Sequence, residues 1–149
     1  MNIGEICNRE VSMIQKDDSL LQDGKLMRDH HVGSLVVVEE KGEGSIPISI
    51  ITDRDILIEV LAEGISLEKI AVRDIMTASL ITAKEQDKVY ETIQKMQVQG
   101  IRRIPVVNEK GILVGILSLD DVLEIVAEEI KKLADVVYME REKEALHRP

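Results

Sequence analysis

Two stretches of the chain place a hydroxyl group and a carboxylate at the same spacing. Thr52 precedes Asp55 and Ser118 precedes Asp121, each directly after an apolar run. A carboxylate one turn into a helix can accept two hydrogen bonds from neighbouring sugar hydroxyls, and bonds to a charged acceptor are strong. The same spacing also fits a capping box, in which hydroxyl and acid only satisfy backbone N–H groups at a helix start. The pattern therefore allows both sugar binding and helix capping.

The two stretches lie in two copies of one longer unit. When residue 6 is aligned with residue 75, Met27 falls on Met96, and the valines at 37 and 38 fall on those at 106 and 107. After a three-residue excess in the first copy, Asp55 falls on Asp121. A match that continues through the whole unit indicates an internal repeat and predicts two similar domains.

Each copy predicts the same order of elements. A short apolar strand (residues 11–14 and 80–82) precedes a helix, a hairpin of two strands rich in β-branched residues, and a second helix that begins at Asp53 or Leu119. Asp18 and Asp87 are placed to cap the first helices, and His31 and Gly100 to end them in the left-handed conformation.

The predicted fold class is α+β, with two β-α-β-β-α units. Because one such unit is too small for an adequate core, the two should pack together with pseudo-two-fold symmetry. The predicted boundaries are 1–64 for the first unit, 65–127 for the second, and 128–149 for a C-terminal helix and tail. Val122, Val126, Ile130, Leu133 and Val137 form an apolar stripe on that helix, which indicates core packing or a dimer contact.

Composition argues against several classes of protein. The net charge of −9 argues against nucleic-acid binding, and the absence of Phe and Trp argues against stacking on bases. No apolar run is long enough for a membrane helix, and the N-terminus has no signal-peptide pattern. A single cysteine favours a reducing, cytoplasmic location. No catalytic constellation and no metal-ligand spacing is visible.

The chain resembles a pair of CBS domains, the regulatory unit called a Bateman module, over roughly residues 4 to 127. The resemblance rests on "VGSLVVVEE" with "ISIITDRDIL" in the first copy, and on "VRDIMT" with "GIRRIPVVNEKGILVGILSLDDVL" in the second. It implies a non-enzymatic protein that binds an adenosyl compound in clefts between the two domains. It further implies that no cofactor is obligatory.

The resemblance also implies roles for individual residues. Asp55 and Asp121 would bind ribose hydroxyls with Thr52 and Ser118 beside them, and Thr82 would lie near the base or the sugar. Arg102 and Arg103 would contact phosphate, which suits the bidentate geometry of guanidinium groups. The expected aliphatic walls around adenine are Ile14, Ile104 and Pro105.

The copies differ where phosphate would bind. Gly33 and Ser34 stand in the first copy where the second has Arg102 and Arg103, so we expect the second cleft to bind better. Lys95, Arg102, Arg103 and Lys110 are the one clear positive cluster in this acidic sequence.

The predicted function is regulation by an adenosyl small molecule (AMP, ADP, ATP or S-adenosylmethionine), in a homodimer that signals to an effector protein not yet known. The alternative is a ligand-free structural or protein-interaction module in which the two hydroxyl-x-x-Asp motifs are helix caps only.

Overall fold

A computed structural model describes residues 1–77 and 79–148, and within them the predicted α+β architecture is confirmed. The first copy contains β1 (Met13–Gln15), α2 (Leu20–His30), β2 (Ser34–Lys41), β3 (Gly44–Thr52) and α3 (Asp53–Ile56), which continues as a π-helical turn, Leu57–Leu61. The second copy contains β4 (Ala83–Lys84), α4 (Val89–Gln99), β5 (Arg103–Val107), β6 (Leu113–Ser118) and α5 (Leu119–His147). A short helix, α1 (Ile3–Ile6), precedes them, and the 3-10 turns Leu67–Lys69 and Val72–Asp74 join the copies.

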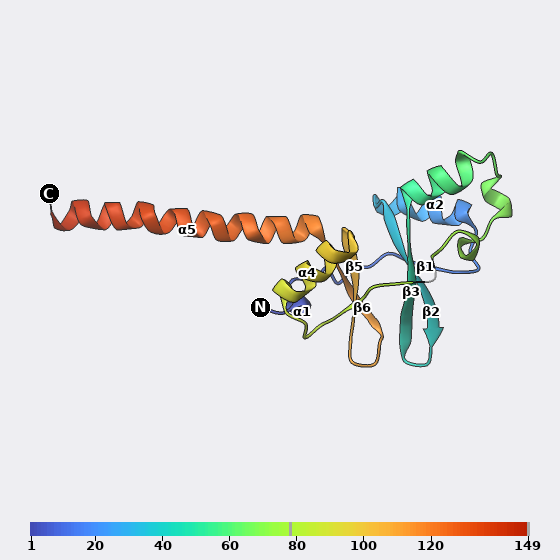
Figure 1. The fold of residues 1–149 in the computed structure, drawn as a ribbon, viewed down its shortest axis with the longest axis horizontal. Coiled ribbons are helices and arrows are strands. Elements are labelled where there is room, and N and C mark those ends of the chain that lie inside the picture. Colours follow the sequence, from blue (N-terminus) through green and yellow to red (C-terminus); the bar gives the residue numbers. More distant parts are fainter. Residues whose placement is uncertain (78, 149) are drawn as a thin grey trace. The chain divides into compact units, whose positions relative to one another are not determined.

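Each copy builds one three-stranded sheet, ordered β1-β2-β3 and β4-β5-β6 (Figure 1). β1 runs parallel to β2, with Ile14 beside Val37, and β2 is antiparallel to β3. In the second copy β4 runs parallel to β5, with Ala83 beside Val106. The first strands lie one to three residues later than the sequence predicts, because the pairing partner and not the apolar run alone fixes where a strand begins.

The helix ends follow the sequence more closely than the helix starts. His31 ends α2 at φ 55° and Gly100 ends α4 at φ 63°, both in the left-handed conformation as predicted. The predicted caps Asp18 and Asp87 are wrong. Their carboxylates accept hydrogen bonds from the backbone N–H groups of Gln15 and Lys84, both at 2.9 Å, and so close the turn before each helix. Ser19 caps α2 instead.

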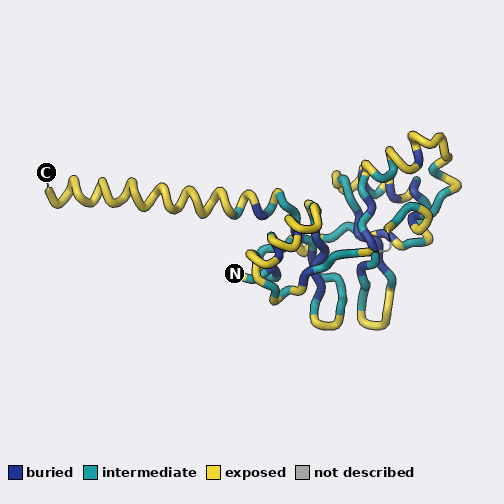
Figure 2. The backbone as a smooth tube through the Cα atoms, viewed as in Figure 1, coloured by how far each residue is buried: buried dark blue, intermediate teal, exposed yellow. Residues whose placement is uncertain are grey.

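The core of the first copy lies between its sheet and α2. Leu20 and Met27 of α2 pack with Leu35, Val37 and Ile51 of the sheet, and all five are buried. Figure 2 shows the strands mostly as buried or intermediate and the hairpin tips as exposed. This burial on both faces accounts for the almost continuously apolar strand sequences.

Segments cross between the copies in a symmetric way. The N–H of Ile3 donates to the carbonyl of Asp87, and the N–H of Val72 donates to the carbonyl of Asp18, both at 2.9 Å. The segment before each copy thus bonds to the other copy, and Ile3 and Val72 are both fully buried. These two equivalent hydrogen bonds are related by the pseudo-two-fold symmetry of the pair of copies.

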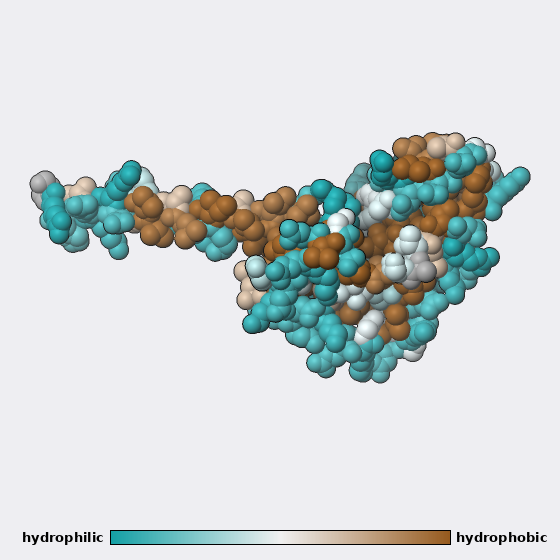
Figure 3. All heavy atoms as spheres, in the orientation of Figure 1, coloured by the Kyte–Doolittle hydropathy of each residue, from teal (hydrophilic) through white to brown (hydrophobic). Residues whose placement is uncertain are grey.

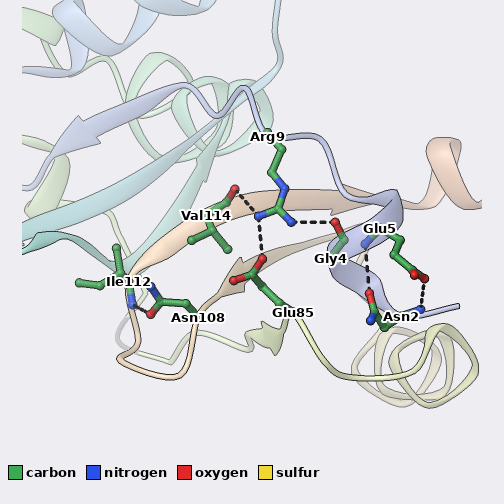
Figure 4. A network of polar contacts seen from close by, with 8 residues as sticks. All are labelled: Asn2, Gly4, Glu5, Arg9, Glu85, Asn108, Ile112 and Val114. Carbon is green, nitrogen blue, oxygen red and sulfur yellow. Dashed lines mark hydrogen bonds and ion pairs between the residues drawn. The ribbon is translucent and has the colours of Figure 1, made fainter.

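Polar contacts fix the N-terminal segment on the second sheet (Figure 4). Arg9 donates from Nη2 to the carbonyl of Gly4 at 2.7 Å and pairs through Nη1 with Glu85 at 2.8 Å. Asn2 caps α1 by accepting the N–H of Glu5, whose carboxylate accepts the N–H of Asn2. The segment is therefore an ordered part of the second copy's surface.

A compact unit of residues 1–117 is followed by a second unit that starts at Ser118 and consists of α5. The helix continues to His147, so the predicted tail is helical up to that residue, while Pro149 lies outside the described residues. No helix in the described ranges is long and apolar enough to cross a bilayer.

Candidate functional site

The repeated hydroxyl-x-x-Asp motifs form capping boxes in both copies. Thr52 Oγ1 accepts the N–H of Asp55 at 3.1 Å, and Asp55 Oδ2 accepts the N–H of Thr52 at 2.9 Å. Ser118 Oγ accepts the N–H of Asp121 at 3.1 Å, and Asp121 Oδ2 accepts the N–H of Ser118 at 3.4 Å. The capping interpretation of these residues is therefore correct as far as the backbone is concerned.

Capping does not use the whole carboxylate. Oδ2 of Asp55 and Oδ2 of Asp121 hold the caps, while Oδ1 of each makes no hydrogen bond within the part of the chain that the structure describes. Both side chains are half-buried. Each acid thus has one oxygen held in a fixed direction and a second oxygen with acceptor capacity left for another group.

In the first copy, β2 and β3 bring the candidate residues to one end of the sheet. Ser34 lies directly opposite Thr52 in the antiparallel ladder. The N–H of Asp53 donates to the carbonyl of Gly33 at 2.9 Å. Gly33, Ser34, Thr52 and the start of α3 therefore meet at this end of the sheet, one turn from Asp55.

In the second copy, the expected phosphate and base contacts lie at the amino ends of β4 and β5. Thr82 immediately precedes β4, and the register that pairs Ala83 with Val106 places Thr82 beside Pro105. Arg103 is the first residue of β5 and Arg102 is exposed just before it. These residues belong to the unit of residues 1–117, whereas Ser118 and Asp121 belong to the unit that starts at Ser118.

Lys95 joins this group through a contact that the sequence does not specify. Its ammonium donates to the carbonyl of Thr82 at 3.2 Å. Lys110, by contrast, lies in the turn between β5 and β6 and pairs with Glu43 at 2.6 Å. Since β5 runs from Arg103 toward that turn, Lys110 lies at the opposite end of the strand, and its assignment to the positive cluster is wrong.

The expected aliphatic walls are interior residues. Ile14 is 3% exposed, Ile104 is fully buried, and Pro105 is buried in β5. Ile14 belongs to the hydrophobic core of the first copy. In the conformation described, these side chains pack against protein atoms.

Sequence reasoning missed one buried acid, Asp23. It lies on the same face of α2 as Leu20 and Met27, is fully buried, and neither carboxylate oxygen has a hydrogen-bond partner. Burial, and after it the negative charge of Asp55, raises the pKa of Asp23 to about 7. Its position within the apolar stripe of α2 was the signal that could have found it.

The equivalent position in the second copy is Thr92, which is also buried. Its hydroxyl donates to the carbonyl of Lys88 at 3.1 Å, as a buried polar group should. Ser49, which lies opposite Val37 in the first sheet, is a second buried polar group without a partner. Its counterpart is Gly115. The first copy therefore carries polar groups in its interior that the second lacks or satisfies.

Two surface hollows lie at the other end of the sheets. One, of about 360 Å³, is lined by residues 15–17 and 38–41, and the other, of about 480 Å³, by residues of the two hairpin turns and by Glu85 and Gln86. Lys16 pairs with Glu39 across the first at 2.9 Å. Neither hollow contains a predicted site residue. Within the described ranges, no group of three or more His, Cys, Asp or Glu is arranged to hold a metal ion.

Comparison with known families agrees with this architecture. The CBS domain family model matches residues 3–62 and 72–128. The chain belongs to the CBS domain family. Beyond the second CBS domain, α5 continues from the end of the match at residue 128 to His147.

Several proteins are similar along most of the chain. An uncharacterized protein of Methanopyrus kandleri is 35% identical over 142 residues, covering 91% of this chain and 71% of that protein. A mitochondrial CBS domain-containing protein of Arabidopsis thaliana is 40% identical over 115 residues, which cover 76% of this chain but 55% of that protein. The chain thus spans about half the length of the plant relative.

Two solved structures have the same fold. An uncharacterized conserved protein from Pyrococcus horikoshii is 31% identical with a TM-score of 0.73, covering 84% of this chain and 91% of that one. The CBS domain pair of protein MJ0100, solved in complex with 5-methylthioadenosine and S-adenosyl-L-methionine, is 26% identical with a TM-score of 0.75, covering 87% and 98%. A similar CBS domain pair therefore binds adenosyl compounds.

Proposed function

We propose that this CBS domain pair is a regulatory module that binds an adenosyl compound and transmits the bound state to a partner protein. The observation that carries the proposal is the repeated cap. In each copy a half-buried Asp is held by the backbone through Oδ2 and keeps Oδ1 available. In each copy, this oxygen can accept hydrogen bonds from the vicinal hydroxyls of one ribose.

Binding to such a carboxylate needs little rearrangement. The capping box already fixes the rotamers of Asp55 and Asp121, so a ribose that donates to them orders no further side chain. Arg103 and Lys95 would supply positive charge for phosphate at the second copy. A ligand regulates only if its affinity differs between two states of the protein or its assembly, and the predicted homodimer supplies such an assembly.

The complex of MJ0100 with 5-methylthioadenosine and S-adenosyl-L-methionine supports the class of ligand. AMP, ADP and ATP remain candidates alongside S-adenosylmethionine, and the ribose they share is the part that the two carboxylates would recognise. The walls expected of Ile14, Ile104 and Pro105 would require those strand residues to become accessible when adenine binds.

The first experiment asks what the purified protein already holds. With no Trp and two Tyr, the chain absorbs weakly near 280 nm, so a co-purifying adenine compound would dominate the spectrum at 260 nm. Calorimetric titration with AMP, ADP, ATP and S-adenosylmethionine would then rank the ligands. A protein that binds none of them would leave the alternative, a structural or interaction module.

Alanine substitution of the two acids separates ligand binding from capping. Asp55→Ala and Asp121→Ala should each weaken the ligand at that copy by about 1–3 kcal/mol, the usual loss for a hydrogen bond to a charged group. Asp74→Ala is the matched control, because Asp74 accepts the N–H of Ala71 in a cap at 2.9 Å but has no proposed ligand. All three should lower stability by about 1 kcal/mol. Unchanged affinity in the first two variants would contradict the ribose contact.

One observation favours the alternative, a ligand-free structural or protein-interaction module. Both hydroxyl-x-x-Asp motifs form complete helix caps. This alternative predicts that the three variants behave alike, with a loss of stability and no calorimetric signal from any adenosyl compound. The comparison with Asp74→Ala therefore decides between the two functions.

A further inference from the structure

The two copies differ in charge at the end of the sheet where sugar and phosphate would bind. Each copy has two acids in the first turn of the helix that follows its sheet, Asp53 and Asp55 in α3 and Asp120 and Asp121 in α5, so the difference lies in the start of the middle strand. A Cβ atom placed on Gly33 would lie 3.2 Å from Asp53 Oδ2, so the Asp53 carboxylate extends over the start of β2. In the second copy, the corresponding start of β5 carries Arg102 and Arg103.

A third acid, Asp23, lies within electrostatic reach of Asp55 and is an independent observation. It is fully buried, neither oxygen has a hydrogen-bond partner, and the charge of Asp55 acts on it directly. Burial is the main cause of the raised pKa of Asp23, and the negative charge of Asp55 is the second. The negative charge of Asp55 that acts on Asp23 would also act on a phosphate at this place.

The cation nearest in sequence does not cancel this charge. Arg54 lies between Asp53 and Asp55 with an exposed side chain, and successive residues on a helix point in directions about 100° apart. Gly33 and Ser34 offer phosphate no positive charge from β2.

We infer that the first copy takes an adenosyl compound whose 5′ substituent is uncharged or positively charged, and that phosphorylated adenosine compounds go to the second copy. Asp55 would hold the ribose, and Asp23 and Asp53 would disfavour phosphate there. At the second copy Arg103 would favour phosphate by charge-assisted, bidentate hydrogen bonds. This selectivity rests on the proposed function, because it assigns a ligand class to each of the two proposed sugar sites.

Calorimetry of the ligand-free full chain with adenosine, AMP and S-adenosylmethionine tests the selectivity. Asp55→Ala and Asp121→Ala identify which isotherm belongs to which copy. At the first copy, AMP should bind at least about tenfold more weakly than S-adenosylmethionine, and at the second copy the order should reverse.

A substitution that places an arginine in the first copy gives a second test of the selectivity. Ser34→Arg introduces a guanidinium at the position equivalent to Arg103, whereas a side chain at Gly33 would crowd Asp53. It should raise AMP affinity at the first copy about tenfold and leave adenosine affinity unchanged within about twofold. Ser34→Gln, which introduces a polar but uncharged side chain, should do neither. Asp23→Thr, which installs the residue of the second copy, should raise AMP affinity in the same direction.

The possible outcomes distinguish a failure of the inferred ligand selectivity from a failure of the proposed adenosyl binding. If neither these three compounds nor ADP nor ATP binds the unaltered protein, the proposed function fails. If AMP and S-adenosylmethionine bind the first copy equally well, or if folded Ser34→Arg gains no AMP affinity, the selectivity is wrong while nucleoside binding stands.

Discussion

Asp23 shows how one residue can make stability depend on pH. Its carboxyl is fully buried without a hydrogen bond, and its pKa rises from 3.8 to about 7 on folding. The folded state therefore binds a proton more tightly than the unfolded chain does. The contribution to stability is fully present below pH 4 and is lost as pH rises toward 7, the opposite of the usual behaviour of an Asp.

Asp23→Thr should remove this pH dependence. The threonine hydroxyl can donate to the carbonyl of Ser19, as Thr92 does to the carbonyl of Lys88. We expect a gain of about 2 kcal/mol in unfolding free energy at pH 8 relative to pH 4, half of the ~4 kcal/mol that the full pKa shift implies, because local opening admits water to the carboxylate. Urea denaturation at the two pH values measures it. An equal effect of the substitution at both pH values would show that Asp23 does not titrate on folding.

For single residues, the sequence predicted correctly those contacts that depend on residues close together in the chain. A hydroxyl three residues before an acid is a short-range pattern, and both Thr52 with Asp55 and Ser118 with Asp121 form the predicted boxes. Asp23 was missed because the periodicity argument considers apolar positions only, although its place in the stripe of α2 was visible in the sequence. The partner of Lys95, the carbonyl of Thr82, depends on tertiary contacts that no local pattern contains.

At the scale of elements, the exchange of N-terminal segments is the main feature that the sequence did not reveal. The repeat predicted two units in sequence order, yet Ile3 bonds to the second copy and Val72 to the first. Such pairing depends on contacts between residues far apart in the chain. Turn and helix-end conformations, such as those of His31 and Gly100, were predictable because they depend on neighbouring residues only.

Ile3→Ala should therefore destabilise the second copy although Ile3 lies near the chain terminus. The side chain is fully buried, and truncation of a buried isoleucine costs about 2–4 kcal/mol. Val98→Ala in α4 is the control, since Val98 is 80% exposed and its truncation should change stability little. Hydrogen exchange should show faster exchange in β4 and in the residues bonded to α1. A loss confined to α1 itself would mean that the segment only lies on the surface.

For the whole molecule, the repeat was the strongest predictor. It identified the fold class, because two small units with buried strand faces must pack on each other. It did not determine the state of assembly, which depends on surface that the monomer leaves exposed. That surface is most extensive on α5, where Figure 3 shows apolar residues gathered along the helix.

The stripe predicted on α5 is exposed over most of its length. Val122 is buried, but Val126, Ile130, Leu133 and Val137 are between 44% and 68% exposed. Leu123 and the four exposed residues of the stripe follow one another at spacings of three, four, three and four residues. This is the pattern of a coiled-coil seam. An exposed apolar stripe of this kind marks a contact surface, and we propose that a second copy of the chain covers it.

Ile130→Lys tests that assembly. Burial of this side chain in both copies contributes about 2–3 kcal/mol, so its loss should weaken the dimer on the order of 100-fold in sedimentation equilibrium. Glu128→Lys introduces the same side chain on the opposite face, two positions away, and should leave the dimer intact. If both variants sediment as the unaltered protein does, the dimer contact lies outside this stripe. If the unaltered chain is monomeric at high concentration, α5 needs a different partner, and the stripe becomes the first place to look for the effector protein.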